Sequence, residues 1–326
     1  MKNKYFTIVA LEEGQAHFES EGFLINQNGS GWVKTPPEAG SFEVEAGDEL
    51  MIASEEDNDL ITAAAAFLTF RTTFMYKVEG NIMSLSYGHQ FRGKTEIQTE
   101  KEFSELFMGD DNLISAEDLV LPATDLADDC YAFMFNGCSN LVRAPKVLPA
   151  KVLADNCYYN MFGGCSSLTT TPKLPATTLA ERCYAYMFYG CKALVKAPAL
   201  PATELEEGCY YNMFSDCTSL VKPPKLPATE LAIDCYNYMF NDCFSLQEAP
   251  DLPAETLVED CYKGMFQLCI NLRKAPSELP CRSVVNGCMQ GMFAGCTKLT
   301  ELPATPYLTG DAVSTAGCMP LYDKDY

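Results

Sequence analysis

The stretch Leu174–Pro201, LPATTLAERCYAYMFYGCKALVKAPALP, is one unit of a tandem repeat that fills more than half of the chain. Its opening Leu-Pro pair recurs mostly every 26 or 27 residues, with a shorter last step of 23. A fixed period of this length predicts a solenoid, in which each unit buries an apolar face against its neighbours. The pair begins at Leu121, Leu148, Leu174, Leu200, Leu226, Leu252, Leu279 and Leu302.

Apolar residues inside the unit recur every four positions, at Leu179, Cys183, Met187 and Cys191. This stripe predicts an amphipathic α-helix of about three turns, which Gly190 would help to end. The following segment, Leu194–Leu200, is predicted to be extended, and its proline limits a paired strand to roughly two to four residues. We therefore expect a curved stack of coils, with short parallel strands on one side and helices on the other.

The first part of the chain does not repeat. Its short alternating segments are separated by glycine, proline and asparagine turns, a pattern that predicts a small antiparallel sandwich. Trp32, the only tryptophan, is interpreted as a core anchor, with a ligand platform as the alternative. The predicted strands are Phe6–Leu11, Ala16–Glu19, Phe23–Asn26, Gly31–Lys34, Phe42–Val44, Glu49–Ala53 and Phe67–Phe74.

These patterns divide the chain into four predicted parts: a β-rich module over residues 1–78, an N-terminal cap over 79–120, the repeats over 121–302 and a C-terminal cap over 303–326. In the N-terminal cap, Phe103 and Phe107 match Tyr131 and Phe135 of the first full repeat. Glu102 and Asp110 stand at the cysteine positions of this cap, and we expect them on a face open to water.

Fourteen of the sixteen cysteines form seven pairs with a spacing of eight residues. On a continuous helix the two members of a pair lie about 12 Å apart, beyond a disulfide's Cα limit of about 7 Å. We predict free, buried thiols that pack as small hydrophobes, with a disulfide ladder between units as the alternative. The pairs are Cys130/Cys138, Cys157/Cys165, Cys183/Cys191, Cys209/Cys217, Cys235/Cys243, Cys261/Cys269 and Cys288/Cys296.

The remaining cysteines, Cys281 and Cys318, are predicted to be free thiols, or else one bridge that ties down the chain end. A zinc site is not expected, because the chain has no C-x-x-C motif and its two histidines, His17 and His89, precede the repeats. No other metal site and no cofactor is predicted.

The net charge of −21 argues against nucleic acid and anionic membranes as partners. No apolar run is long enough for a transmembrane helix, so membrane insertion is not expected. The apolar run Tyr5–Leu11 is too short for a clear signal peptide and is interpreted as a strand.

No catalytic motif is found, and the protein is predicted not to be an enzyme. Most acidic residues recur at one place in the unit, where they fit the positive end of a helix dipole, with calcium binding as the alternative. Members of this row are Asp128, Asp155, Glu181, Glu207 and Asp234.

Two rows of side chains are candidate ligand-binding surfaces. A basic row runs along the extended segments and suits an acidic glycan or an acidic protein surface, although a solvated strand face is the alternative. A tyrosine row lies within the predicted helices, where contact with a partner competes with packing between units. The basic row is Arg143, Lys146, Lys173, Lys196, Lys222, Lys225, Arg273 and Lys274, and the aromatic row is Phe133, Tyr159, Tyr186, Tyr211 and Tyr238.

The repeat resembles the BspA-like leucine-rich repeat family of bacterial surface proteins, found in gut and oral anaerobes. The segments that carry the resemblance are LPATTLAERCYAYMFYGCKALVKAP (Leu174–Pro198) and LPATELEEGCYYNMFSDCTSL (Leu200–Leu220), and it extends over roughly three quarters of the chain.

The resemblance implies a leucine-rich repeat solenoid without catalytic activity that recognises a protein or glycan on a host or cell surface. It also implies adhesion and a location at the cell surface or in the secreted fraction. Similar repeats occur in phages of such bacteria, so a virion component that displays the repeat is the alternative. Neither the ligand nor the oligomeric state follows from the sequence.

Overall fold

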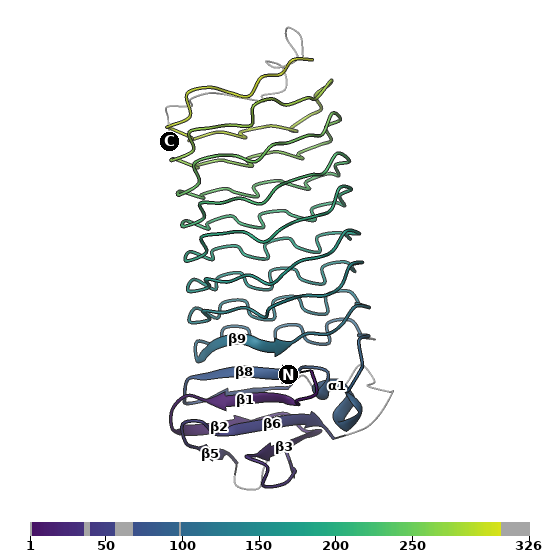
Figure 1. The fold of residues 1–326 in the computed structure, drawn as a ribbon, viewed down its shortest axis with the longest axis vertical. Helices are drawn as coiled ribbons and strands as arrows, with labels where there is room; N and C mark the ends of the chain where they lie inside the picture. Colours follow the sequence, from purple (N-terminus) through teal and green to yellow (C-terminus); the bar gives the residue numbers. More distant parts are fainter. Residues whose placement is uncertain (1, 36–39, 56–67, 98, 308–326) are drawn as a thin grey trace.

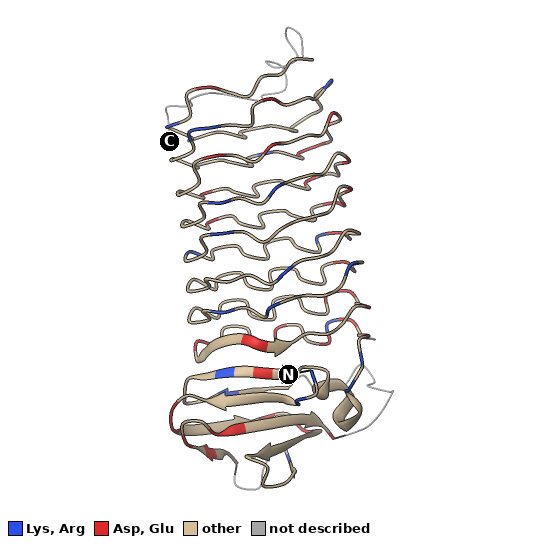
Figure 2. Ribbon diagram, viewed as in Figure 1, with Lys and Arg blue, Asp and Glu red and all other residues tan. Residues whose placement is uncertain are grey.

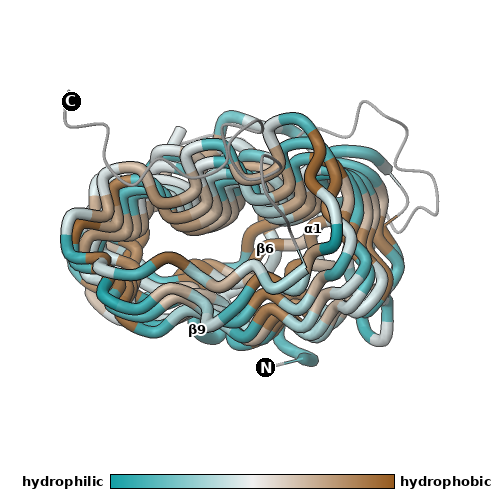
Figure 3. The backbone as a smooth tube through the Cα atoms, turned by 90° about the horizontal axis from the view of Figure 1, so that it is seen from above, coloured by the Kyte–Doolittle hydropathy of each residue, from teal (hydrophilic) through white to brown (hydrophobic). Residues whose placement is uncertain are grey.

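A computed structural model describes residues 2–35, 40–55, 68–97 and 99–307. The described part begins with strands and continues as a regular stack of coils, each coil being one sequence repeat (Figure 1). Figure 3 shows the coils from above as a flattened ring, with strand β9 on one long side and a scalloped backbone on the other.

The seven strands predicted for the N-terminal region are confirmed, with shifts of one or two residues at half of the ends of the first six strands and a shorter last strand. They are β1 (Phe6–Ala10), β2 (Gly14–Phe18), β3 (Phe23–Gln27), β4 (Val33–Lys34), β5 (Phe42–Val44), β6 (Glu49–Ser54) and β7 (Phe70–Thr72). The predicted start of the last strand, Phe67, lies outside the described residues.

Two further strands, β8 (Tyr76–Asn81) and β9 (Leu113–Val120), lie where a linker and cap were expected. A six-stranded sheet has the order β4-β3-β6-β1-β8-β9, and a three-stranded sheet has the order β5-β2-β7. Two short helices, α1 (Ser84–Tyr87) and the 3-10 helix η1 (Gly88–Gln90), follow β8.

The pairing of β8 with β9 joins the N-terminal strands to the coils. These strands are parallel, whereas the other pairs in the two sheets are antiparallel. Ser115 of β9 forms a parallel bridge with Arg143 of the first coil, so the six-stranded sheet continues into the stack. The predicted boundary between residues 78 and 79 falls inside β8.

The prediction of one helix per repeat is wrong. Each segment instead consists of consecutive tight turns, for example over residues 181–190, and the helices of the described chain are confined to α1 and η1. Arg182, Tyr186 and Gly190 have φ values of 49°, 57° and 69°, so every fourth residue is left-handed. Turns that repeat every four residues place apolar side chains at i, i+4 and i+8 on one face, much as a helix does. The apolar stripe in the sequence therefore does not distinguish turns from a helix.

Backbone hydrogen bonds explain why the turns are stable. The amides of Ala185 and Met187 donate to carbonyls three residues back, those of Arg182 and Tyr184, at 3.0 and 3.2 Å. The alternate amides donate to the next coil, as Tyr186 does to Tyr211 at 2.8 Å. Half of the donors are therefore satisfied only by a neighbouring coil, a partner that an isolated repeat lacks.

The strand side pairs less than predicted. Neighbouring coils meet there through isolated parallel bridges, such as Lys196 to Lys222, rather than strands of two to four residues. Curvature was expected because helices on one side would space the coils more widely than strands on the other. Backbone hydrogen bonds instead join the coils on both sides, so neither side is spaced more widely. The stack in Figure 1 accordingly rises with little of the expected curvature.

Ladders of identical side chains fill the inside of the stack. Tyr184 stacks on Tyr158 and Tyr210 with ring centroids 5.7 and 6.0 Å apart, and a phenylalanine ladder runs beside it. Phe103 stacks on Tyr131 at 5.6 Å and Phe107 on Phe135 at 5.2 Å, which confirms the predicted match of the cap to the repeat.

Glu102 and Asp110 of this cap were expected to face open water but are partly buried, because the N-terminal strands and α1 lie beside them. Asp110 accepts a hydrogen bond from the hydroxyl of Tyr76 in β8 at 2.6 Å, and Glu102 accepts one from Ser86 in α1. These carboxylates therefore link the first strands to the coils.

Candidate binding surface

The extended segment of each coil places basic side chains on the outer surface of the strand side. In the coil of Leu174, Leu194 and Ala197 are buried while Val195 and Lys196 are exposed. Figure 2 shows basic segments recurring from coil to coil above β9. Lys173, Lys196, Lys222 and Lys225 are exposed in this region, and we refer to these four residues as the lysine patch.

The basic row divides into paired and unpaired members. Arg143 lies 3.5 Å from Glu117, Lys146 lies 2.7 Å from Asp118, and Lys274 lies 3.9 Å from Glu248. Within the described residues, no carboxylate lies within 4.0 Å of the ammonium groups of the lysine patch. Among the described residues Arg273 also lacks such a carboxylate, but its neighbour Lys274 has one. The lysine patch, at the centre of the row, is therefore its largest unpaired group.

Two exposed valines, which the sequence analysis missed, lie within the patch. The side chains of Val195 and Val221 are 54% and 40% exposed, and the amide of Val221 donates to the carbonyl of Val195 at 3.0 Å. Each precedes a patch lysine, and this repeated Val-Lys pair was the available sequence signal. The centre of the surface is thus both cationic and apolar.

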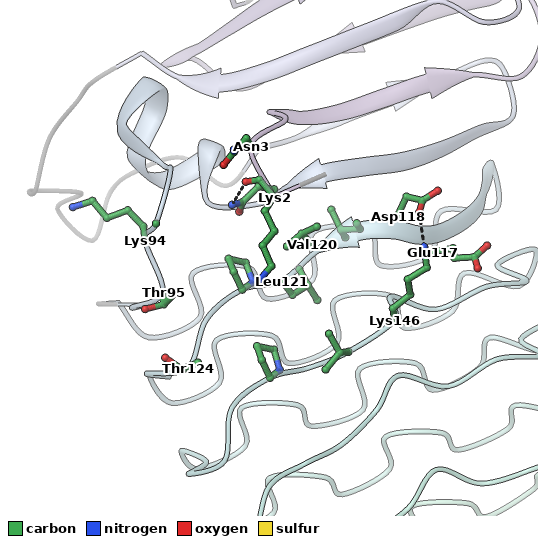
Figure 4. Close-up of a pocket in the computed structure, with 16 residues that line it drawn as sticks. Lys2, Asn3, Lys94, Thr95, Glu117, Asp118, Val120, Leu121, Thr124 and Lys146 are labelled. Atoms are coloured by element: carbon green, nitrogen blue, oxygen red, sulfur yellow. Dashed lines mark hydrogen bonds and ion pairs between the residues drawn. The ribbon is translucent and has the colours of Figure 1, made fainter.

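A groove adjoins the lysine patch at the junction between the N-terminal strands and the coils (Figure 4). Its volume is ≈ 630 Å³, and Val120, Val147, Pro122 and Pro149 are among the residues that line it. Val147 forms a parallel bridge with Lys173, so the groove continues the patch towards β9. Repeat periodicity does not predict this groove, because it exists only where the two parts of the chain meet.

The tyrosine row lies in the turn segments and not on the strand side, so the two predicted rows do not form one site. Tyr159, Tyr186 and Tyr211 are partly buried, and the ring of Tyr186 lies 5.7 Å from that of Tyr159 and 5.3 Å from that of Tyr211. Phe133 extends the row through Tyr159 at 5.3 Å. Partial burial, together with its neighbour Tyr211, raises the pKa of Tyr186 to about 12.

Tyr238 stands apart from that row. No ring contact joins it to the other aromatic side chains in the described part of the chain. Its ring instead covers Gly264, where an added Cβ would lie 2.2 Å from a ring carbon. Packing against the neighbouring coil therefore accounts for its position.

The cysteines lie in the interior. All fifteen described cysteines are buried, no disulfide joins any two of them, and Cys318 lies outside the described residues. The Cys191 thiol lies 3.2 Å from the carbonyl oxygen of Phe162 in the preceding coil, and this contact repeats in most coils. Burial raises the pKa of the Cys183 and Cys235 thiols to about 12, so they are not reactive nucleophiles near neutral pH.

The recurrent acids do not mark helix starts, because those helices do not exist. A carboxylate oxygen of Asp128 accepts a hydrogen bond from the backbone amide of Asp155 at 3.1 Å. A carboxylate oxygen of Asp155 in turn accepts one from the backbone amide of Glu181 at 3.0 Å. These acids act between coils instead of within one. No group of three or more potential metal ligands occurs among the residues that the structure describes.

Trp32 is not a core anchor as expected, since it is only partly buried. Its ring lies 4.9 Å from Tyr5 and 5.0 Å from His89. The Tyr5 hydroxyl is 2.9 Å from Nδ1 of His89, and the three side chains form a surface cluster between the first residues, the β3–β4 loop and η1.

Within the described ranges, no helix is both long enough and apolar enough to span a bilayer. No protein-family model and no curated protein matches the chain. Among solved structures, the chain is similar to the leucine-rich repeat protein of T. pallidum, with 21% identity over 58% of this chain and 78% of that one. The TM-score is 0.37.

Proposed function

We propose that the stack of coils is a leucine-rich repeat solenoid of the BspA-like type, and that it acts as a non-enzymatic scaffold for protein or glycan recognition. The observation that carries this proposal is the lysine patch, which leaves four cations unpaired on one surface of a chain with a net charge of −21. Unpaired like charges repel one another, so a complementary anionic partner gains both attraction and relief of that repulsion.

The proposal includes adhesion at a cell surface or in the secreted fraction, as the family resemblance implies. The scaffold suits this role because each coil adds a similar outer surface at a regular spacing. Contacts made by several coils then add up to an affinity that no single coil provides.

Binding of the full chain to protein and glycan arrays tests the function. The wild type is compared with Lys196→Glu/Lys222→Glu and with Lys151→Glu/Lys298→Glu, which makes the same charge change outside the patch. We expect ligands that the wild type and the second variant bind and that the first variant loses. Equal binding by all three proteins would exclude the lysine patch, and no ligand on either array would contradict a recognition role.

A further inference from the structure

We infer that the lysine patch and the adjoining groove bind an extended acidic polypeptide segment that carries apolar side chains between its carboxylates. This inference rests on the proposed function and selects one class of partner for the same surface. It depends on three features: the spacing of the lysines, the exposed valines and the position of the groove.

The lysines are arranged to receive a row of anions. Lys196 and Lys222 are direct partners in a parallel bridge, and neighbouring strands lie about 4.8 Å apart. Like charges placed opposite each other destabilise a sheet, so this pair is unfavourable until an anion lies between the two ammonium groups. Lys173 continues the positive surface into the preceding coil, and Lys225 lies three residues after Lys222 in the same segment. A chain of carboxylates that runs along the stack meets one or two cations per coil.

The valines argue for a polypeptide rather than a polysaccharide. Val195 and Val221 present exposed methyl groups beside Lys196 and Lys222, and Val147 is 42% exposed at the groove. Apolar side chains of a partner can cover these groups and exclude water from the centre of the contact, as in protein–protein interfaces with an apolar core and a polar rim. Hydroxyl-rich sugars gain little from such methyl groups.

The positions of the aromatic residues also favour a polypeptide partner. The strand-side segments at residues 169–173, 195–199 and 221–225 contain no aromatic residue on which a sugar ring can stack. The tyrosines lie in the turn segments, where the rings of neighbours are tilted by about 60° and cover one another. The surface that holds the cations therefore lacks a sugar-stacking platform.

The groove provides a place for an apolar anchor. Val120, Val147, Pro122 and Pro149 contribute apolar surface, and Val147 adjoins Lys173 of the patch. A segment that lies along the lysines thus reaches the groove at Val147, and Lys146 and Asp118, which also line the groove, are paired with each other (Figure 4). A partner side chain of the size of leucine or phenylalanine fits the volume of ≈ 630 Å³.

Fluorescence anisotropy with defined probes tests the inference on the full chain. The probes are a labelled peptide of glutamate, leucine and serine, its counterpart with serine at every leucine position, and labelled polygalacturonate as an anionic polysaccharide. We expect the leucine-containing peptide to bind at low salt at least about tenfold more tightly than the serine counterpart, a difference equivalent to about 1.4 kcal/mol. Added salt should weaken binding of both peptides.

Variants separate the contributions of charge and apolar surface. Lys196→Glu/Lys222→Glu should abolish binding of both peptides, and Lys151→Glu/Lys298→Glu should retain it. Val195→Ser/Val221→Ser should remove the preference for the leucine-containing peptide without changing the urea midpoint of unfolding, since both side chains are exposed. Val147→Ser tests the groove in the same way.

Two results would overturn the inference: tighter binding of polygalacturonate than of the leucine-containing peptide, or an unchanged peptide preference in the valine variants. Lysine-dependent binding of a glycan would refute the polypeptide partner while leaving the proposed recognition function intact. Failure of all three probes and of the arrays would refute both.

Discussion

At the residue scale, the left-handed positions of the turn segments determine which amino acids the repeat accepts. The structure places glycine, asparagine or aspartate at many of them, for example Asn156, Asn160 and Gly164 in one coil. These residues tolerate positive φ better than others. Glycine, asparagine and aspartate at four-residue spacing were therefore a sequence signal for turns. The apolar stripe, which also fits a helix, led to the wrong prediction.

Gly164→Ala is expected to lower the free energy of unfolding by about 1–2 kcal/mol, because an alanine at a φ of +76° is strained. An added Cβ would lie 3.5 Å from Gly137, an ordinary contact, so the loss measures the backbone conformation alone. Urea denaturation is the measurement, with Thr177→Ala in the next coil as a control that should change stability by less than about 0.5 kcal/mol. Equal effects of the two changes would contradict the left-handed geometry.

The buried thiols predict a loss of stability in alkali. In the folded chain the pKa of the Cys183 and Cys235 thiols is about 12, above the ordinary value of 9.0. Below pH 9 the thiols are protonated in both states, and as pH rises from 9 towards 12 only the unfolded chain releases the protons. Each such thiol then costs about 1.4 kcal/mol of stability per pH unit.

Urea midpoints between pH 7 and pH 11 test this thiol linkage. We expect a plateau up to about pH 8 and a steep decline above about pH 9. The variant Cys183→Ala/Cys235→Ala should decline less steeply, since it has two fewer linked thiols. A midpoint that is constant through pH 10, or an identical slope in the variant, would show that the thiols are not linked to folding.

At the element scale, the turn segments differ from helices in where their hydrogen bonds go. A helix satisfies its own backbone, whereas each turn segment here depends on the next coil for every second amide. The recurrent acids follow the same rule, since Asp155 receives the amide of Glu181 from another coil. The coils are therefore stable only as a stack.

Asp155→Ala is expected to lower stability by about 1 kcal/mol, because the Glu181 amide loses its acceptor. Asp155→Asn retains an acceptor oxygen and should restore most of the loss. Glu181→Ala is the matched control in the next coil, where no backbone amide among the described residues reaches the carboxylate, and its cost should stay below about 0.5 kcal/mol. If both acids stood at helix starts, the two alanine variants would lose similar amounts of stability. A larger loss for Asp155→Ala in urea denaturation therefore supports the turn structure.

At the scale of the whole molecule, the N-terminal strands and the coils share one sheet and one core. Phe107 joins them, since its ring lies 6.1 Å from Phe6, 6.2 Å from Phe70 and 5.2 Å from Phe135. The strands cover the open end of the stack, and β8 pairs with the backbone hydrogen-bonding groups at the edge of β9. That edge would otherwise be exposed to pairing with other chains.

Phe107→Ala is expected to lower the free energy of unfolding by about 3–5 kcal/mol, because it leaves a cavity between the strands and the coils. Met108→Ala, at the exposed neighbour, should cost less than about 0.5 kcal/mol. Urea denaturation followed by tryptophan fluorescence, which reports Trp32 near β1, and by circular dichroism of the whole chain should give coincident transitions in the wild type. Separate transitions would show that the strands and coils fold independently.

The sequence by itself determined the repeat period, the seven N-terminal strands, the buried cysteine ladder and the match of the cap to the first repeat. These features follow from periodicity and local turn chemistry, which a chain carries in its residue order. It also placed Lys173, Lys196, Lys222 and Lys225 on the extended segments of successive repeats, which lie side by side in a solenoid.

Only the tertiary structure decided between helix and turn, because both present the same four-residue apolar stripe and differ in whether amides pair within a coil or between coils. Only the structure paired Arg143 and Lys146 with the carboxylates of β9, leaving the four lysines of the patch unpaired. The exposure of Val195 and Val221 and the groove beside Lys173 likewise depend on how coils and strands meet. Contacts between segments far apart in the chain set each of these features, and no single repeat contains them.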